Sequence, residues 1–172
     1  MNWVVRYSIN FFVLLLAQML FLNKFNLFGS MAHINILPFV FLAAPLTANR
    51  VQLIAMAFVS GLLADSFDGT YGLYTFSMSV GAYITPLYGK FLFSKEEVDV
   101  NKSGIRDFVM VRALLFAMVP TLVFMLCLYN ITHFSFSGFF LFQLKALIST
   151  ILSVIFMALI MLLFPNKKQK RR

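Results

Sequence analysis

The sequence predicts an all-α protein that crosses a membrane with six helices, and three observations lead to this prediction. First, 61% of the 172 residues are hydrophobic and only 12% are charged, whereas about a quarter of the residues of soluble globular domains are charged. Second, the apolar residues lie in long runs with short polar segments between them. Third, basic residues gather in alternate segments between the runs. A soluble fold could not hide this much apolar surface, so lipid is the expected solvent for most of the chain.

Six apolar runs are candidate spans, since a helix needs about 20 apolar residues to cross roughly 30 Å of hydrocarbon. We expect the spans at residues 4–22, 34–46, 51–65, 72–93, 108–129 and 139–164. The first run ends at the polar pair Asn23-Lys24. The second is short and contains Pro38 and Pro45, so it is either broken or spans only together with its flanks. The third ends at Asp65, shortly before a turn-forming Asp-Gly-Thr sequence at residues 68–70.

The last three runs are longer. The fourth opens at Gly72 and ends before a polar loop at residues 94–107. Pro120 is expected to kink the fifth helix, and Pro165 stops the sixth. Residues 1–165 are therefore expected to form a single six-helix transmembrane domain, followed by a basic cytoplasmic tail at residues 166–172.

The distribution of Lys and Arg predicts the orientation. Six spans place both termini on one side, and cytoplasmic segments carry the excess of basic residues. The side with the termini would hold Arg6, Arg50, Lys90, Lys95, Lys102, Arg106, Arg112 and the five basic residues of the tail. The other side would hold only Lys24, while Lys145 lies inside the last span. We therefore expect both termini on the cytoplasmic side of the membrane. The tail should contact an anionic lipid leaflet rather than nucleic acid.

Small residues recur every four positions in the third and fourth runs. The repeats are Ala57–Gly61–Asp65 in the third run and Ser77–Gly81–Thr85–Gly89 in the fourth. Small residues at this spacing let two helix backbones approach closely in a membrane. Because a short turn joins the two runs, we expect them to form a tightly packed hairpin along these stripes.

Two of the six acidic residues, Asp65 and Asp68, lie three positions apart at the end of the third run. Asp68 is interpreted as a solvated turn residue. Asp65 shares a face with Gly61 at a helix C-terminus, which disfavours a carboxylate, so it needs a cation or several hydrogen-bond donors. Lys145 is the candidate cation, because it lies near the same depth and shares a face with two serines, Ser149 and Ser153. The alternatives are that Lys145 snorkels to the surface and that Asp65 reaches interfacial water.

The sequence carries no signature of catalysis or of a metal site. Ser60 lacks the extended motif of an intramembrane serine protease, and Glu96-Glu97 lacks the arginine of the EExxxR protease motif, because Asn101 stands there. Cys127 is the single cysteine, and no glycine loop for phosphate is present. We expect a protein that is not an enzyme and that has no cofactor and no metal.

Three segments follow one another in the order ILPFVFLAAP, AFVSGLLADSFDGTYGLYTF and AYITP. They resemble the MreD family, the small polytopic rod-shape-determining membrane proteins of bacteria, and the specific part of the likeness covers residues 35–86. The family's Gly-x-x-x-Asp element, with the Gly that opens the next helix, corresponds to Gly61, Asp65 and Gly72, and Pro86 ends the third segment. The chain departs from the family at Thr85, where a basic residue is common, and at Tyr74, where a small or polar residue, often His, is common.

The resemblance implies a non-enzymatic subunit of the bacterial cell-wall elongation complex, a scaffold for MreC and the peptidoglycan synthase. The implied partners are MreC, MreB filaments, RodA and a class B penicillin-binding protein, besides the lipid bilayer. It also implies similarity to the six-helix substrate-binding subunits of energy-coupling-factor vitamin transporters, which is the alternative function. The predicted outer loops are poor in charge and rich in Phe, which favours a scaffold over a subunit that binds a hydrophilic vitamin.

The expected topology can be tested with alkaline phosphatase, which is active only outside the cytoplasm. Fusions after Ser30, Asp68 and Ser135 should be active, and fusions after Glu97 and Arg172 should be inactive, because basic segments stay in the cytoplasm. Activity of the fusion at Glu97 would overturn this topology.

Overall fold

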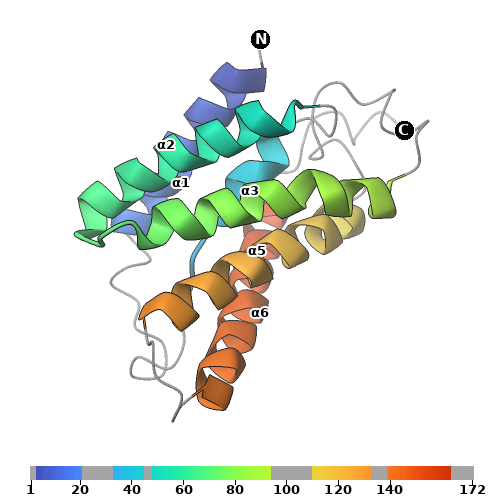
Figure 1. Cartoon of the computed structure of the whole chain (residues 1–172). Coiled ribbons are helices and arrows are strands. Elements are labelled where there is room, and N and C mark those ends of the chain that lie inside the picture. The colour runs from blue at the N-terminus through green and yellow to red at the C-terminus, as the bar shows by residue number, and fades with distance from the viewer. Residues whose placement is uncertain (1–2, 21–32, 45–47, 94–109, 133–138, 164–172) are drawn as a thin grey trace.

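The fold is described for residues 3–20, 33–44, 48–93, 110–132 and 139–163 by a computed structural model. These residues form six helices and no strand, which confirms the expected all-α class. The helices are α1 (Trp3–Leu20), the 3-10 helix η2 (Leu37–Ala43), α2 (Arg50–Asp68), α3 (Leu73–Leu92), α5 (Met110–Thr132) and α6 (Phe139–Leu163) (Figure 1). The expected polar loop at 94–107 and the basic tail at 166–172 lie outside the described residues, as do Lys24 and Pro45.

Three of the described helices are long and apolar enough to cross a membrane, judged by length and composition. They are Arg50–Asp68 of α2, Val111–Thr132 within α5 and Phe139–Ile160 within α6. Tyr7–Gln18 of α1 is a shorter apolar helix. The 20-residue α3 has the length but a lower mean hydropathy than the three. Membrane association is therefore indicated by α2, α5 and α6.

The second expected span does not form a long helix. Only the seven residues of η2 are helical, and residues 33–36 before them are not. The reason lies in Pro38 in the first turn of η2. Proline has no backbone N–H, so an α-helix could not continue backwards with a bond from residue 38 to the carbonyl of Ile34. The side chain of Gln18 donates to that carbonyl instead, with Nε2 3.0 Å from the oxygen.

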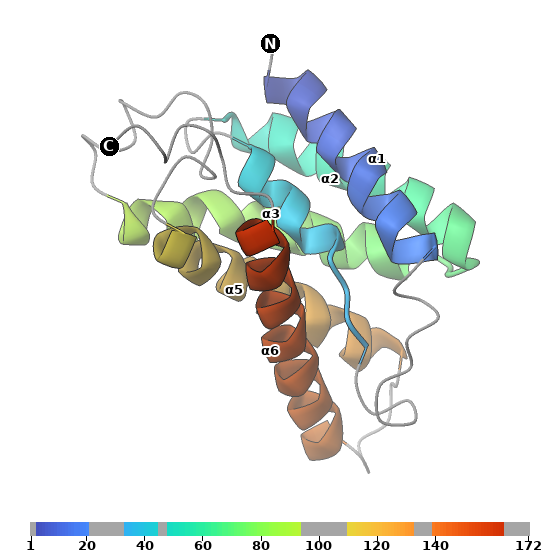
Figure 2. The same ribbon diagram turned by 180° about the vertical axis from the view of Figure 1, so that it is seen from behind.

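The helices alternate in direction. α2 and α3 form an antiparallel hairpin, α5 lies against α3 and α6, and η2 contacts α1, α3 and α5. The end of α1, the α2–α3 turn and the end of α5 lie at one end of the molecule (Figures 1 and 2). The starts of α2 and α5 and the end of α3 lie at the other end. α6 runs across the direction of the α2–α3 hairpin rather than alongside it.

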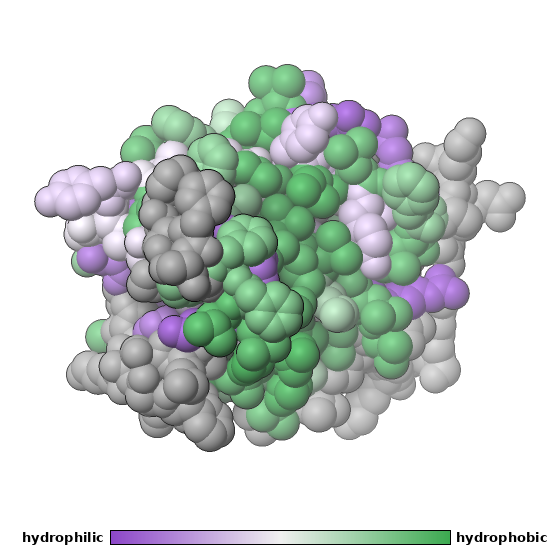
Figure 3. All heavy atoms as spheres, turned by 60° about the horizontal axis from the view of Figure 1, so that its bottom comes forward, coloured by the Kyte–Doolittle hydropathy of each residue, from purple (hydrophilic) through white to green (hydrophobic). Residues whose placement is uncertain are grey.

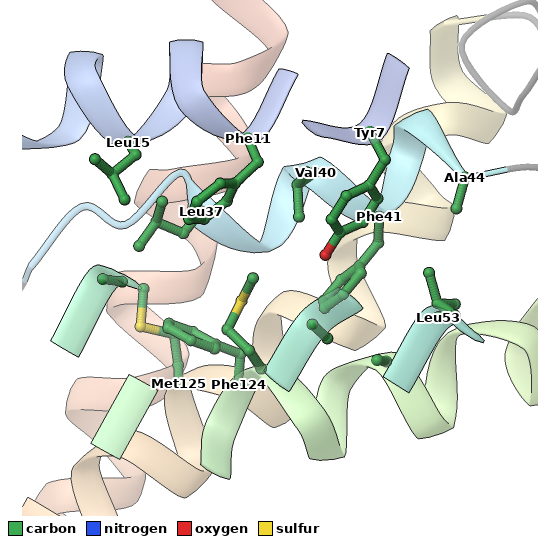
Figure 4. Packing of buried hydrophobic residues seen from close by; sticks show 14 of the residues in the cluster. Tyr7, Phe11, Leu15, Leu37, Val40, Phe41, Ala44, Leu53, Phe124 and Met125 are labelled. Carbon is green, nitrogen blue, oxygen red and sulfur yellow. The ribbon is translucent and has the colours of Figure 1, made fainter. Parts of the chain in front are cut away.

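The short helix η2 lies in the hydrophobic core. Leu37, Val40 and Phe41 of η2 are fully buried, and side chains of α1 point toward them (Figure 4). The main cluster around these three residues combines Tyr7, Phe11 and Leu15 of α1 with Leu53 of α2 and Phe124 and Met125 of α5. An element too short to span alone is thus the packing centre for helices distant in sequence.

The outer surface of the helices is rich in apolar side chains, and the interior contains polar ones beside its hydrophobic clusters. Every α-helix exposes large apolar side chains, such as Phe12 of α1, Phe58 of α2, Phe76 of α3, Leu115 of α5 and Ile151 of α6. A broad hydrophobic area runs through the middle of the face seen in Figure 3. Among the buried side chains are many hydroxyl groups, namely Ser60, Thr75, Ser77, Thr85, Thr121, Ser149, Thr150 and Ser153. This pattern suits a lipid solvent, which leaves apolar groups outside without penalty.

The predicted close packing of the α2–α3 hairpin is confirmed on the α2 side. Ala57, Gly61 and Asp65 are all buried. A Cβ atom at Gly61 would lie 2.4 Å from Cα of Thr75 and 2.8 Å from its backbone nitrogen. Only a residue without a side chain can therefore bring α2 this close to the first turn of α3.

The expectation that the α3 stripe faces α2 is wrong at Gly81. Ser77, Gly81, Thr85 and Gly89 are buried, as is Pro86 inside the helix. The atoms nearest to a Cβ built at Gly81, however, belong to the Phe41 ring of η2, at 3.1 Å, and to the Pro120 carbonyl of α5, at 3.7 Å. α3 packs against three elements, so small residues four apart need not all face its hairpin partner.

Gly61→Ala should destabilise the protein more than Gly81→Ala. The new methyl group at residue 61 meets backbone atoms that cannot move alone, whereas at residue 81 it meets the end of a phenylalanine ring. Overpacking of this kind costs about 1–3 kcal/mol. The midpoint of thermal unfolding in detergent measures both changes, and equal midpoints for the two variants would contradict the assigned contact.

Candidate functional site

Asp65 lies in the last turn of α2, and its carboxylate binds the start of α3. Oδ1 accepts hydrogen bonds from the Tyr74 N–H at 3.0 Å and from the Thr70 hydroxyl at 2.6 Å. Oδ2 accepts from the Thr75 N–H at 2.9 Å and from the Thr75 hydroxyl at 2.6 Å. Both oxygens are thus occupied by donors from the turn and from the next helix.

This arrangement is a helix cap supplied by the preceding helix. The N-cap residue of α3 is Gly72, which has no side chain to accept the first-turn N–H groups. The backbone N–H groups of Tyr74 and Thr75 are at the N2 and N3 positions, where an N-cap side chain normally accepts their hydrogen bonds. Asp65 takes that place, and its negative charge is also favoured by the positive end of the helix dipole. The requirement for several donors at Asp65 is therefore met within the hairpin.

The candidate ion pair between Asp65 and Lys145 is not formed. The donors to Asp65 come from Thr70, Tyr74 and Thr75, and no ion pair joins it to Lys145 in the described part of the chain. The Lys145 ammonium lies over the Phe142 ring, 5.8 Å from its centroid, and the residue is half-buried. Sequence spacing placed both groups near one depth, but depth alone does not bring two helices into contact.

The turn itself depends on two glycines. Gly69 (φ 66°) ends α2 and donates its N–H to the carbonyl of Asp65, as does the Thr70 N–H at 3.1 Å. Gly72 (φ 83°) donates to the Thr70 carbonyl at 2.9 Å. Both need the left-handed conformation that glycine adopts without strain. The three residues thus act together: Gly61 allows the close contact between the helices, Asp65 caps α3, and Gly72 allows the turn.

Asp68 is more than the solvated turn residue that its sequence context predicts. It is the last residue of α2 and is half-buried, with one carboxylate oxygen out of contact with solvent. The Tyr74 hydroxyl lies close to the side chains of Asp68 and Asn35. Tyr74, one of the two departures from the family pattern, therefore links the hairpin to the segment before η2.

That segment, residues 33–36, is held by side chains of α6 and α1. Its backbone N–H groups at His33 and Asn35 donate to Ser149 Oγ at 3.2 Å and Ser153 Oγ at 3.0 Å. The side-chain amide of Gln18 receives the Ile36 N–H at 3.0 Å. Backbone N–H groups outside a helix need other partners when they are buried, and these side chains supply them.

Lys145, Ser149 and Ser153 share one face of α6. The two serines on this face point into the protein and are fully buried, whereas Lys145 is half-buried. Ser149 also shares a hydrogen bond of 2.9 Å with the Tyr129 hydroxyl of α5. Gln18 and Asn35 were not predicted as contact residues. Their signal was present, however, because each is an amide side chain within an apolar run.

The other residues considered from sequence have structural partners or lie outside the description. Ser60 donates to the Ala57 carbonyl at 2.9 Å, and its hydroxyl lies 3.4 Å from that of Tyr7. Glu96 and Glu97 lie outside the described residues. Within the described residues, no group of three His, Cys, Asp or Glu side chains is placed to bind a metal ion.

Comparison of the chain with protein-family models, with curated proteins and with solved structures found no match. The site is therefore interpreted from its own geometry, which is that of a rigid connector: every group at the Asp65 cap is engaged in holding two helices and a turn together.

Asp65→Ala should lower the stability of the protein by about 1–3 kcal/mol. The change leaves the N–H groups of Tyr74 and Thr75 without their acceptor, and a buried donor without a partner costs roughly this amount. Thermal unfolding in detergent measures the loss. Ser66→Ala is the matched control, because its exposed hydroxyl only bonds back to the Leu62 carbonyl of the same helix.

A double-mutant cycle with Asp65→Ala and Lys145→Met measures whether the side chains of Asp65 and Lys145 interact. The two stability changes should add to within about 0.5 kcal/mol, as for residues that do not interact. A larger coupling would show that the two charges meet.

Proposed function

We propose that the chain is a non-enzymatic subunit of the bacterial cell-wall elongation complex, similar to MreD, and that it scaffolds MreC and the peptidoglycan synthase in the inner membrane. The observation that carries the proposal is the hairpin cap. The three residues matched to the family's motif, Gly61, Asp65 and Gly72, work together in one hydrogen-bonded and closely packed unit. Such a motif preserves a shape, which suits a scaffold.

The charged ends of the helices support the proposed orientation. Arg50 is the first residue of α2, Lys90 lies in the last turn of α3, and Arg112 lies in the first turn of α5. These three helix ends lie at one end of the molecule, opposite the turn that carries Asp65 and Asp68 (Figure 1). The basic end would face the cytoplasm, with both chain termini, and the acidic turn would face the outer side.

Six crossings are compatible with the dimensions of the elements. The four residues before η2 can reach at most about 13 Å and the seven residues of η2 about 14 Å, so together they stay somewhat below the thickness of the hydrocarbon layer. α6 has 25 residues and is about 37 Å long, and since it runs across the direction of the α2–α3 hairpin, it would cross at a steep tilt relative to that hairpin. The second crossing is thus formed by an irregular segment protected by α1 and α6.

Capture of MreC tests the proposal. The affinity-tagged chain is co-expressed with MreC, extracted in mild detergent and purified, and MreC should be retained by the wild type and by Ser66→Ala. Asp65→Ala should retain less, because its scaffold is loosened. A folded chain that retains no MreC would refute the proposal, and a co-purified vitamin would instead support the transporter alternative.

A further inference from the structure

The α2–α3 turn projects two aromatic side chains away from the protein. Tyr71, between the two left-handed glycines, is fully exposed, and Phe67 in the last turn of α2 is 64% exposed. The backbone that carries them is fixed by the Asp65 cap and by the hydrogen bonds of Gly69, Thr70 and Gly72. A rigid turn that presents apolar rings outward is a contact surface rather than a solvated loop.

The opposite end of α3 repeats this feature. Phe91, in the last turn, is 90% exposed and stands next to exposed Lys90. The 20 residues of α3 extend about 30 Å, which equals the thickness of the hydrocarbon layer. The two exposed aromatic residues, Tyr71 and Phe91, are therefore separated by one membrane thickness.

The surface between these ends is apolar on its outward side. Phe76 and Tyr83 are exposed along α3, whereas Thr75, Ser77 and Thr85 are buried. The lower mean hydropathy of α3 thus comes in part from residues that face the protein interior. A helix with this distribution can lie in lipid along its full length.

We infer that Phe67 and Tyr71 form a membrane-interface anchor, in which the Tyr71 ring lies among the lipid headgroups at one surface while Phe91 and Lys90 mark the other. The occupant is lipid, because the apolar outward face is continuous with the turn and its length matches the bilayer. An apolar ring with a polar hydroxyl suits this boundary, and a cation beside Phe91 suits anionic headgroups. The inference rests on the proposed membrane-spanning orientation of α3.

Depth-dependent fluorescence quenching tests the anchor. The chain has a single tryptophan, so Trp3→Phe provides a background for the reporters Tyr71→Trp, Phe91→Trp and Tyr83→Trp. Each full-length variant is reconstituted in vesicles of phosphatidylcholine and phosphatidylglycerol carrying bromine atoms either near the headgroups or near the bilayer centre. Tyr71→Trp and Phe91→Trp should be quenched more strongly by the shallow bromines, and Tyr83→Trp by the deep ones.

The reporters sit on exposed positions, and matching helical circular dichroism identifies variants that keep the fold. If the bromolipids quench Tyr83→Trp strongly but do not quench Tyr71→Trp, the anchor is overturned, because the turn then lies in water or against another protein. Deep quenching at residue 71 would overturn the assigned depth. Neither result depends on MreC, so the anchor and the proposed scaffold can fail separately.

Discussion

The carboxylate of Asp65 joins three parts of the molecule, and much of the remaining structure depends on its position. By binding the N–H groups of Tyr74 and Thr75, it fixes where α3 starts relative to where α2 ends. That register brings Thr75 against Gly61 and directs the Tyr74 hydroxyl toward Asn35 and Asp68. Hydrogen bonds of a carboxylate are among the strong ones, and they gain strength where water is scarce.

Hydrogen bonds between buried polar groups also hold the rest of the interior together. Helices in lipid gain little from burying apolar surface, so close backbone contact and internal hydrogen bonds must hold them together. Hydroxyl groups bond to carbonyls four residues earlier in the same helix at Thr85, Thr121 and Thr150. The longer side chain of Gln18 instead forms hydrogen bonds with backbone groups of Ile34 and Ile36, which lie outside any helix.

The sequence was sufficient for the helical class, for the positions of the five long helices and for the importance of Gly61 and Asp65. These features follow from run length and residue spacing, which act locally. The candidate pairing of Asp65 with Lys145 was wrong, whereas the alternative of several donors was right, because periodicity gives the face of a residue but not the helix that meets it. The break before η2 followed from Pro38, whereas its stabilisation by Ser149 and Ser153 could not be predicted, since no local pattern links residues 116 and 118 positions apart.

That long separation has a consequence for the order in which the molecule is assembled. The hydrogen bonds of the Asp65 cap join residues five to ten positions apart, so the α2–α3 hairpin can close while the ribosome is still making the rest of the chain. The segment at residues 33–36 receives two of its acceptors from α6, the last described helix to emerge. Its N–H groups must find temporary partners, in water or at the translocation machinery, until synthesis is nearly complete. The segment that leads into η2, the central element of the core, is therefore among the last to reach its final hydrogen bonds.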